Sequence, residues 1–200
     1  TFDMGPSWYW MPDVFDKFFA DFGKNREDYY SLTKLNPSFS IVFDNKEKVD
    51  IPAEEKELIE FFENIEKGAG NKLQEFMSDA KYKYDTSMVK LIYKPGKSIV
   101  EFIELDVIKG VFKLNLFSNF KKFVRKYFKD KKLTALMDFP VLFLGSAPED
   151  TPALYSLMNY AGLLLGTWYP KNGMYRIIES MEELAKELGV KIHTNAEISN

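Results

Sequence analysis

The clearest structural signal in this chain is the stretch TPALYSLMNYAGLLLGTWYPKNGM, which runs from Thr151 to Met174. Thr151 and Pro152 predict the cap and first turn of a helix, because threonine can accept a hydrogen bond from an unpaired backbone N–H and proline has none to lose. The apolar side chains that follow share one helical face, namely Leu154, Leu157, Met158 and Ala161. The first half of the stretch therefore predicts an amphipathic helix.

After Gly166 the residue types change from helix formers to strand formers. Trp168 and Tyr169 favour a strand, and Pro170 with Asn172-Gly173 predicts a tight turn. A glycine turn at this place leaves room for a ligand to approach the backbone.

A second helix is predicted after the turn, because its apolar residues are spaced by threes and fours: Met174, Ile177, Ile178, Met181, Leu184, Ala185 and Leu188. Gly189 suits the left-handed cap at the end of this helix, and Val190-Lys191-Ile192 predicts the beginning of a strand. Helix, strand, turn, helix and strand together form a local α/β arrangement.

The chain before this stretch adds further helices and short strands. Asp13 precedes an amphipathic helix that Gly23 ends. Three strands of a small antiparallel meander are predicted at residues 32–35, 39–43 and 49–51. Two more helices are expected, one within residues 44–66 and one over residues 71–93. The predicted fold class is therefore α+β, with a small mixed or antiparallel sheet covered by helices.

The composition is that of a folded protein, since 46% of the 200 residues are hydrophobic and the formal net charge is −3. Cysteine is absent, which excludes disulfides and thiolate metal sites. The single histidine, His193, cannot form a metal site alone, so no metal is predicted. No apolar run approaches the roughly 18 residues that a membrane-spanning helix needs, and no signal peptide is visible. These features are compatible with a reducing, cytoplasmic location.

Residues 109–132 carry nine basic residues and one acid in an otherwise acidic chain. Apolar residues take one side of a predicted helix here and basic residues take the other. Such a helix can lie in a membrane interface, with its rings in the acyl boundary and its charges on anionic headgroups. The predicted membrane-contact residues are Phe117, Phe120, Lys121, Lys122, Val124, Arg125, Lys126 and Phe128.

Two other interpretations of this helix are open. It could face the protein core and keep a solvated basic rim. Its lysines beside aromatic rings could instead follow nucleic acid phosphates, although the overall acidity of the chain argues against nucleic acid.

The sequence lacks the motifs of several kinds of binding site and catalysis. No G-x-G-x-x-G follows a strand, so this chain has no loop for a dinucleotide pyrophosphate. Ser146 and Ser156 lack the glycines of a nucleophile elbow, which argues against a serine hydrolase. Glu149-Asp150 suits a helix terminus better than acid/base catalysis. The sequence motifs do not identify a catalytic base.

Five segments resemble the bacterial-type phytoene desaturases, also called phytoene dehydrogenases, which are FAD-dependent carotenoid desaturases. These segments are residues 2–9, 153–156, 168–171, 173–174 and 184–190. The resemblance covers nearly the whole chain in matching order. One departure is Asn172, because the family usually has two glycines where this chain has Asn172-Gly173. Asparagine tolerates positive φ better than most residues, so we expect the turn to be kept.

The resemblance implies an internal fragment of a two-domain flavoprotein, with the N-terminal dinucleotide-binding motif and the C-terminal flavin segment outside it. Residues 1–12 would adjoin the flavin domain, and residues 13–170 would form the substrate and membrane-facing domain. Residues 171–200 would return into the FAD-binding domain as a helix and a strand. FAD would be the cofactor of the full-length protein and would not be retained by this fragment, which alone would be inactive.

The resemblance also implies roles for particular residues. Those near the flavin would be Asp3, Gly5, Pro6, Ser7, Gly173 and Met174. Those at the boundary between substrate and cofactor would be Trp168, Tyr169 and Pro170. Core packing of a strand would explain the tryptophan and the tyrosine equally well.

The implied activity is dehydrogenation of a long acyclic, phytoene-like polyene by proton loss and hydride transfer to flavin. A hydrocarbon has no polar handle, so its binding must come from apolar burial. Because carotenoids dissolve in lipid, the resemblance favours membrane contact for the basic helix, and a cytoplasmic, peripherally membrane-associated protein. The alternatives are a lipid- or isoprenoid-binding module without redox chemistry, and a related flavoprotein isomerase or amine oxidase.

Overall fold

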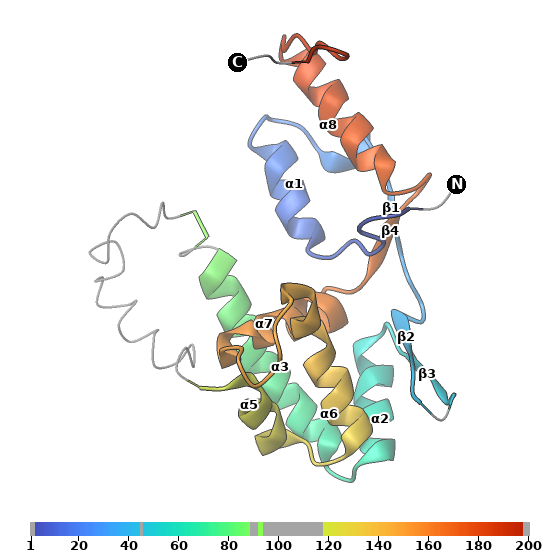
Figure 1. Ribbon diagram of the computed structural model, residues 1–200, viewed down its shortest axis with the longest axis vertical. Coiled ribbons are helices and arrows are strands. Elements are labelled where there is room, and N and C mark those ends of the chain that lie inside the picture. The colour runs from blue at the N-terminus through green and yellow to red at the C-terminus, as the bar shows by residue number, and fades with distance from the viewer. Residues whose placement is uncertain (1–2, 45, 89–91, 94–117, 198–200) are drawn as a thin grey trace, which may run out of the picture. The chain divides into compact units, whose positions relative to one another are not determined.

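Strand β4 (Trp168–Pro170) lies between two segments from the other end of the chain. In the computed structural model, which describes residues 3–44, 46–88, 92–93 and 118–197, β4 pairs antiparallel with β1 (Leu32–Lys34). On its other edge, Tyr9 N–H donates to the Trp168 carbonyl at 3.0 Å and Trp168 N–H donates to the Tyr9 carbonyl at 2.9 Å. These pairings connect Thr1–Lys34 with Trp168–Asn200 in one compact unit, called the terminal unit here. Leu35–Thr167 form the second, the central unit (Figure 1).

The two units do not follow the predicted division of the chain. Along the chain, the boundaries between the units fall after Lys34 and before Trp168. The predicted boundaries were after residues 12 and 170. Helix α1 (Pro12–Ala20) therefore belongs with the first residues of the chain. The flavin and substrate roles of the three predicted pieces stay a prediction.

The terminal unit also contains the short 3₁₀ helix η1 (Arg26–Asp28) and helix α8 (Tyr175–Glu187). Its core is a cluster of buried side chains, Tyr9, Phe19, Tyr29, Tyr30, Ile177 and Leu184. Helix α8 ends as predicted, with Gly189 in a left-handed conformation at φ 83°. Residues 190–192 are exposed and are not a strand. A strand needs a neighbouring strand for its hydrogen bonds, and no described strand pairs with residues 190–192. The Val190 N–H donates instead to the Ala185 carbonyl of α8 at 2.9 Å.

The central unit holds the hairpin of β2 (Phe39–Val42) and β3 (Lys48–Ile51), in which Phe39 lies opposite Ile51. The predicted three-stranded meander is wrong, because β1 pairs with β4 and β2 with β3 in separate two-stranded sheets. Turn residues between the three segments predicted the strands correctly, but they do not specify which strands pair.

Helices make up most of the central unit. Before residue 150, those in the described part of the chain are α2 (Glu55–Ile65), α3 (Ala69–Thr86), α5 (Phe120–Tyr127), α6 (Lys131–Asp138) and the 3₁₀ helix η4 (Phe139–Leu144). The helices α2 and α3 confirm the apolar spacing of the sequence, since Leu58, Phe62, Leu73 and Met77 are buried. The predicted extension of the second helix to residue 93 lies partly outside the described residues. Helices and small antiparallel sheets together are compatible with the predicted α+β class.

The predicted helix at residue 153 is present but irregular. It runs through η5 (Ala153–Ser156, 3₁₀), α7 (Leu157–Asn159) and η6 (Tyr160–Leu164, a π-helix). Of the predicted apolar face, Ala161 is buried, whereas Leu154, Leu157 and Met158 are only half-buried. The other buried positions include Ala153, Ser156 and Asn159. Thr151 does not cap it, because the N-cap residue of η5 is Pro152 and no side chain accepts a capping hydrogen bond there. The Thr151 hydroxyl donates instead to the Ala147 carbonyl at 2.8 Å. The number of residues per turn changes from the 3₁₀ to the α and π parts of this segment. The buried side therefore shifts along the helix, and a single helical period cannot predict it.

Glu66 fixes the junction between the end of α2 and the end of α5. Its carboxylate accepts hydrogen bonds from the N–H groups of Lys129 at 2.7 Å and Asp130 at 2.9 Å, and from the Lys72 ammonium at 3.1 Å. Burial by itself would raise the pKa of Glu66, but the two backbone donors and Lys72 outweigh it and lower the pKa below its ordinary value of 4.5.

We therefore expect Glu66→Gln to lower the free energy of unfolding by about 1–2 kcal/mol at neutral pH, because two backbone donors lose a charged acceptor. The folded state holds the proton less tightly than the unfolded chain, so this contribution is present above pH 4.5 and is lost as the pH falls below it. Urea unfolding at neutral and acidic pH measures it, with the exposed Glu60→Gln as the control. A Glu66→Gln effect that stays constant in acid would contradict the prediction.

Candidate functional site

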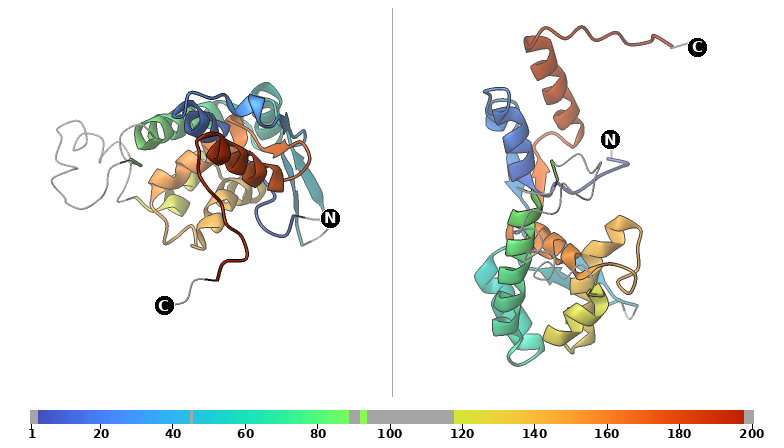
Figure 2. Two further views of the ribbon diagram at one scale, coloured as in Figure 1. Left: turned by 90° about the horizontal axis from the view of Figure 1, so that it is seen from above. Right: turned by 90° about the vertical axis from the view of Figure 1, so that its left-hand side faces the viewer.

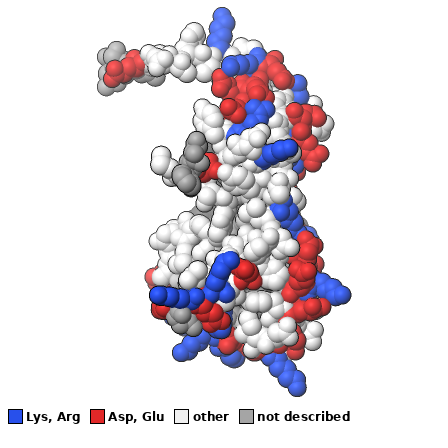
Figure 3. Space-filling view, turned by 90° about the vertical axis from the view of Figure 1, so that its right-hand side faces the viewer, with Lys and Arg blue, Asp and Glu red and all other residues white. Residues whose placement is uncertain are grey.

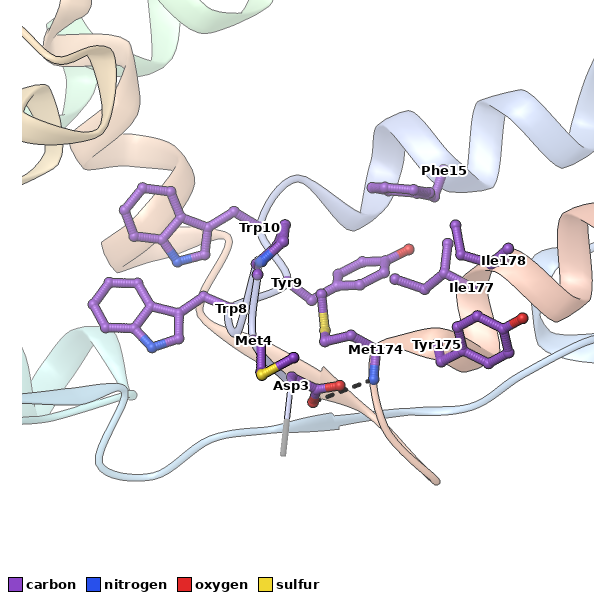
Figure 4. A pocket seen from close by; sticks show the side chains of 12 residues that line it. Asp3, Met4, Trp8, Tyr9, Trp10, Phe15, Met174, Tyr175, Ile177 and Ile178 are labelled. Carbon is purple, nitrogen blue, oxygen red and sulfur yellow. Dashed lines mark hydrogen bonds between the residues drawn. The ribbon is translucent and has the colours of Figure 1, made fainter. Parts of the chain in front are cut away.

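An apolar cavity of about 400 Å³ lies in the terminal unit (Figure 4). Its walls come from residues 3–6 and 8–10, from α1 through Phe15, and from the beginning of α8. The apolar lining residues include Met4, Trp8, Tyr9, Trp10, Met174, Ile177 and Ile178. Among the described residues, Asp3 is the one carboxylate of the lining. Large apolar surfaces with a single charged group suit a hydrophobic ligand.

Asp3 connects two walls of this cavity. Its carboxylate accepts hydrogen bonds from the Tyr169 hydroxyl and, at 3.5 Å, from the Met174 N–H (Figure 4). Met174 is the N-cap of α8, where a negative charge also interacts favourably with the helix dipole. The hydrogen bond with Asp3 raises the pKa of Tyr169, so this hydroxyl stays a donor at neutral pH. Asp3 thus fixes the beginning of the chain to the β4–α8 turn.

The turn between β4 and α8 has the left-handed backbone that the sequence predicted. The φ angle is 77° at Asn172 and 97° at Gly173. A Cβ atom at position 173 would lie 3.8 Å from the Tyr169 hydroxyl oxygen and 3.9 Å from an Asp3 oxygen. These are ordinary contact distances, so the positive φ is what favours glycine here. Asn172 confirms that asparagine is accommodated in this turn.

Tyr9 separates the cavity from the core of the terminal unit. Its hydroxyl lies 2.7 Å from that of Tyr30, and burial raises the pKa of Tyr9. Arg26 donates to the Tyr30 carbonyl at 3.1 Å and to an Asp16 carboxylate oxygen at 2.6 Å. Sequence reasoning missed this network, because Tyr9 and Tyr30 lie in segments with no common local pattern.

Most of the predicted flavin-side residues come together at the cavity. Asp3, Gly5, Pro6 and Met174 line it. Gly173 lies in the adjoining turn, beside the Asp3 carboxylate. Ser7 is exposed and is not part of the lining. Their contact with a cofactor stays a prediction.

The predicted substrate-side residues do not line this cavity. Trp168 packs against the core of the terminal unit, Tyr169 reaches Asp3, and Pro170 is buried. Strand packing is thus one role that the structure gives to Trp168 and Tyr169. Their role in substrate binding stays a prediction.

The predicted membrane-contact helix is α5, and its apolar side faces the core of the central unit. Phe120, Val124 and Phe128 have no exposed surface, and the Phe128 ring packs 5.3 Å from that of Phe62. Side chains in these positions cannot enter a bilayer while the unit is folded, so we correct this part of the prediction. Phe117 lies outside the described residues. The core-facing interpretation of this helix, which the sequence left open, accounts for its phenylalanines.

The basic side of α5 is solvated and partly paired. Lys121 pairs with Glu149, and Arg125 donates to both carboxylate oxygens of Asp138, at 3.0 and 2.7 Å. Lys122 and Lys126 are exposed. Basic and acidic side chains are also interspersed over the face shown in Figure 3, unlike the single-sign surface that binds nucleic acid. No helix in the described part of the chain is long and apolar enough to cross a bilayer.

A second polar cluster, around Lys83, is buried in the central unit. The Lys83 ammonium lies 2.6 Å from an Asp79 oxygen, 3.0 Å from the Ser156 hydroxyl and 3.2 Å from the Ala153 carbonyl. It also lies 4.1 Å from the centre of the Phe123 ring. One signal in the sequence could have predicted this cluster. Lys83 falls within the apolar stripe of α3, and an aspartate lies four residues before it. The cluster attaches α3 to the beginning of the irregular helix.

Comparisons with known proteins agree with the resemblance found in the motifs. A family model described as flavin containing amine oxidoreductase matches residues 1–200. The chain is 39% identical over 198 residues to the carotenoid 3,4-desaturase of Haloarcula japonica, covering 98% of this chain and 40% of that protein. It is 31% identical over 198 residues to the 4,4'-diapophytoene desaturase (4,4'-diaponeurosporene-forming) of Staphylococcus aureus, covering 99% of this chain and 39% of that protein. The chain thus spans about two fifths of the length of these relatives.

Proposed function

This chain belongs to the flavin containing amine oxidoreductase family, and we propose that it forms the substrate-binding part of an FAD-dependent carotenoid desaturase. The full-length enzyme would dehydrogenate a long acyclic polyene. The observation that carries the proposal is the apolar cavity beside Asp3, in a chain whose named relatives are carotenoid desaturases.

The cavity residues fit one part of a flavin. Trp8, Tyr9 and Met174 offer apolar surfaces against which the ring system could pack. The described residues of the lining include no basic side chain, so the diphosphate of FAD would need donors from elsewhere in the full-length protein. When bound, flavin supplies the acceptor for the hydride that the substrate loses.

The residues of this chain would bind the hydrocarbon and exclude water. Each Å² of apolar surface that a polyene buries contributes about 25 cal/mol, so a long chain binds well without polar contacts. Asp3 would hold the first residues against α8 and keep the cavity closed on that side. Membrane association would bring the protein to a substrate that is dissolved in lipid.

The proposal is tested on the full-length protein with bound FAD, mixed without oxygen with an acyclic polyene in detergent. The polyene loses a proton and a hydride, the flavin takes up the hydride, and the absorbance of oxidised flavin should fall. Mass spectrometry should find a product with two hydrogens fewer for each new double bond. Binding without flavin reduction would favour an isoprenoid-binding module, and reduction by an amine alone would favour an amine oxidase.

A substitution tests the role of the cavity itself. Ile178→Glu places a charge in the cavity lining at a half-exposed position, where the fold can tolerate it. We expect KM for the polyene to rise at least about tenfold, because a carboxylate disfavours contact with hydrocarbon. Val42→Glu, at an exposed apolar position of β2, is the matched control. Equal KM values in the two variants would remove the cavity from the proposal.

A further inference from the structure

The carboxylate of Asp3 is held at one oxygen and left open at the other. Oδ2 accepts the hydrogen bonds of the Tyr169 hydroxyl and the Met174 N–H. Among the residues that the structure describes, none donates a hydrogen bond to Oδ1. Gly173 lies beside this oxygen, at a position where a Cβ atom would be 3.9 Å away, so residue 173 does not cover it with a side chain. Oδ1 is therefore a fixed acceptor with room beside it.

The surroundings of this carboxylate are mostly apolar. Asp3 is half-buried and lines the cavity together with Phe15 and Ile178 (Figure 4). These two side chains come from α1 and α8, which lie side by side in the terminal unit and share its core (Figure 2). The described part of the lining contains no basic side chain that could neutralise Asp3.

Such a cavity favours positive charge on the molecule that it holds. Charges interact more strongly in an apolar site than in water. The positive end of the α8 dipole is equivalent to only about half an elementary charge, so it offsets the carboxylate in part. A hydrocarbon that becomes positively charged next to Oδ1 would therefore be stabilised.

Dehydrogenation creates this charge. When a polyene loses a hydride, one C–H bond breaks and both of its electrons leave with the hydrogen to the flavin. The chain is then a carbocation, and a C–H bond next to a positively charged carbon is strongly acidic. The electron pair of that bond forms the new double bond, and its proton needs an acceptor within reach. A carboxylate is a strong enough base for this proton.

We propose that Asp3 is a catalytic residue of the dehydrogenation, whose Oδ1 stabilises the positive charge on the polyene and accepts the proton. The inference rests on the proposed function, because it takes the cavity as the site of the polyene. The Tyr9 hydroxyl in the same lining is a much weaker acceptor, since burial raises the pKa of Tyr9 and its hydroxyl is paired with that of Tyr30.

Asp3→Asn in the full-length protein with bound FAD tests the role of the charge. Asparagine keeps an oxygen that can accept from Tyr169 and Met174, but it cannot take up the proton. We expect kcat for the polyene to fall at least about hundredfold, while KM changes less than about threefold. Tyr169→Phe removes a hydrogen bond of Oδ2 and keeps the charge, so kcat should fall less than about fivefold. Similar losses in the two variants would mean that Asp3 only fastens the chain.

A stable cation gives a second measurement that needs no turnover. Octyltrimethylammonium carries a positive charge on a hydrocarbon chain, and 2,2-dimethyldecane is its neutral isostere, with carbon in place of nitrogen. In non-ionic detergent, calorimetry should show that the native protein binds the cation at least about tenfold more tightly than the isostere. Asp3→Asn should bind the two within about threefold of each other, whereas the exposed Glu60→Gln should keep the native preference.

The outcomes separate this inference from the proposed function. The role of Asp3 is overturned if Asp3→Asn keeps kcat within about threefold of the native value, or if the native protein does not prefer the cation. A native protein that binds the cation selectively but does not oxidise a polyene would contradict the proposed function instead.

Discussion

Lys83→Met should lower the free energy of unfolding of the central unit by about 3 kcal/mol, because it removes one partner of a buried ion pair and leaves the others unpaired. Asp79, the Ser156 hydroxyl and the Ala153 carbonyl would all lose the ammonium. Methionine keeps most of the volume of the side chain, so little of the loss would come from a cavity. Urea unfolding of the full-length variant measures the effect.

The chain offers a matched control on the same helix. Lys81 pairs with Asp85 at 2.6 Å, also four residues apart, but both side chains are more than half exposed. Lys81→Met should cost much less stability than Lys83→Met, because water screens an exposed ion pair. The double variant Asp79→Leu with Lys83→Met should lose less stability than Lys83→Met alone, because no charge is left buried. Equal losses at positions 81 and 83 would contradict the role given to Lys83.

The same residue predicts a dependence on pH. Burial lowers the pKa of Lys83 below its ordinary 10.5, although Asp79 acts in the opposite direction. Between the lowered pKa and 10.5 the unfolded chain binds more protons than the folded one, so stability rises with pH in that window. The stability difference between the native protein and Lys83→Met should therefore grow as the pH approaches 10.5. A difference that shrinks there would show that Lys83 is not desolvated.

Tyr9→Ala should destabilise the terminal unit by about 3–5 kcal/mol, the cost of deleting a large buried ring. Tyr9 is only 2% exposed, and its ring lies 4.6 Å from that of Phe15. The ring is also a wall of the apolar cavity, so polyene binding should weaken together with stability. Urea unfolding and the KM for the polyene measure the two effects.

Tyr9→Phe separates the ring from the hydroxyl. It keeps the packing and the cavity wall but removes the 2.7 Å hydrogen bond to Tyr30, so the loss should be about 1 kcal/mol with little change in KM. If Tyr9→Phe were as damaging as Tyr9→Ala, the hydroxyl pair rather than the ring would be the main contribution of Tyr9.

Local sequence signals predicted much of the secondary structure and part of the candidate site. Helical spacing identified α1, α2, α5 and α8, and glycine with asparagine identified the left-handed turn after β4. The family-like segments selected Asp3, Gly5, Pro6 and Met174, which line one cavity. These predictions succeed because a helical face or a positive φ depends mainly on residues close in sequence.

The sequence by itself determined several of the helices, namely α1, α2, α3, α5 and α8, the glycine turns that end some of them, and which family the chain resembles. Only the tertiary structure decided that β1 pairs with β4, that the phenylalanines of α5 lie in the core, and that Lys83 is buried beside Asp79. An apolar stripe specifies that a face will be covered, but the same stripe suits a core or a membrane. The choice depends on packing against residues far away in the chain, which local spacing does not contain.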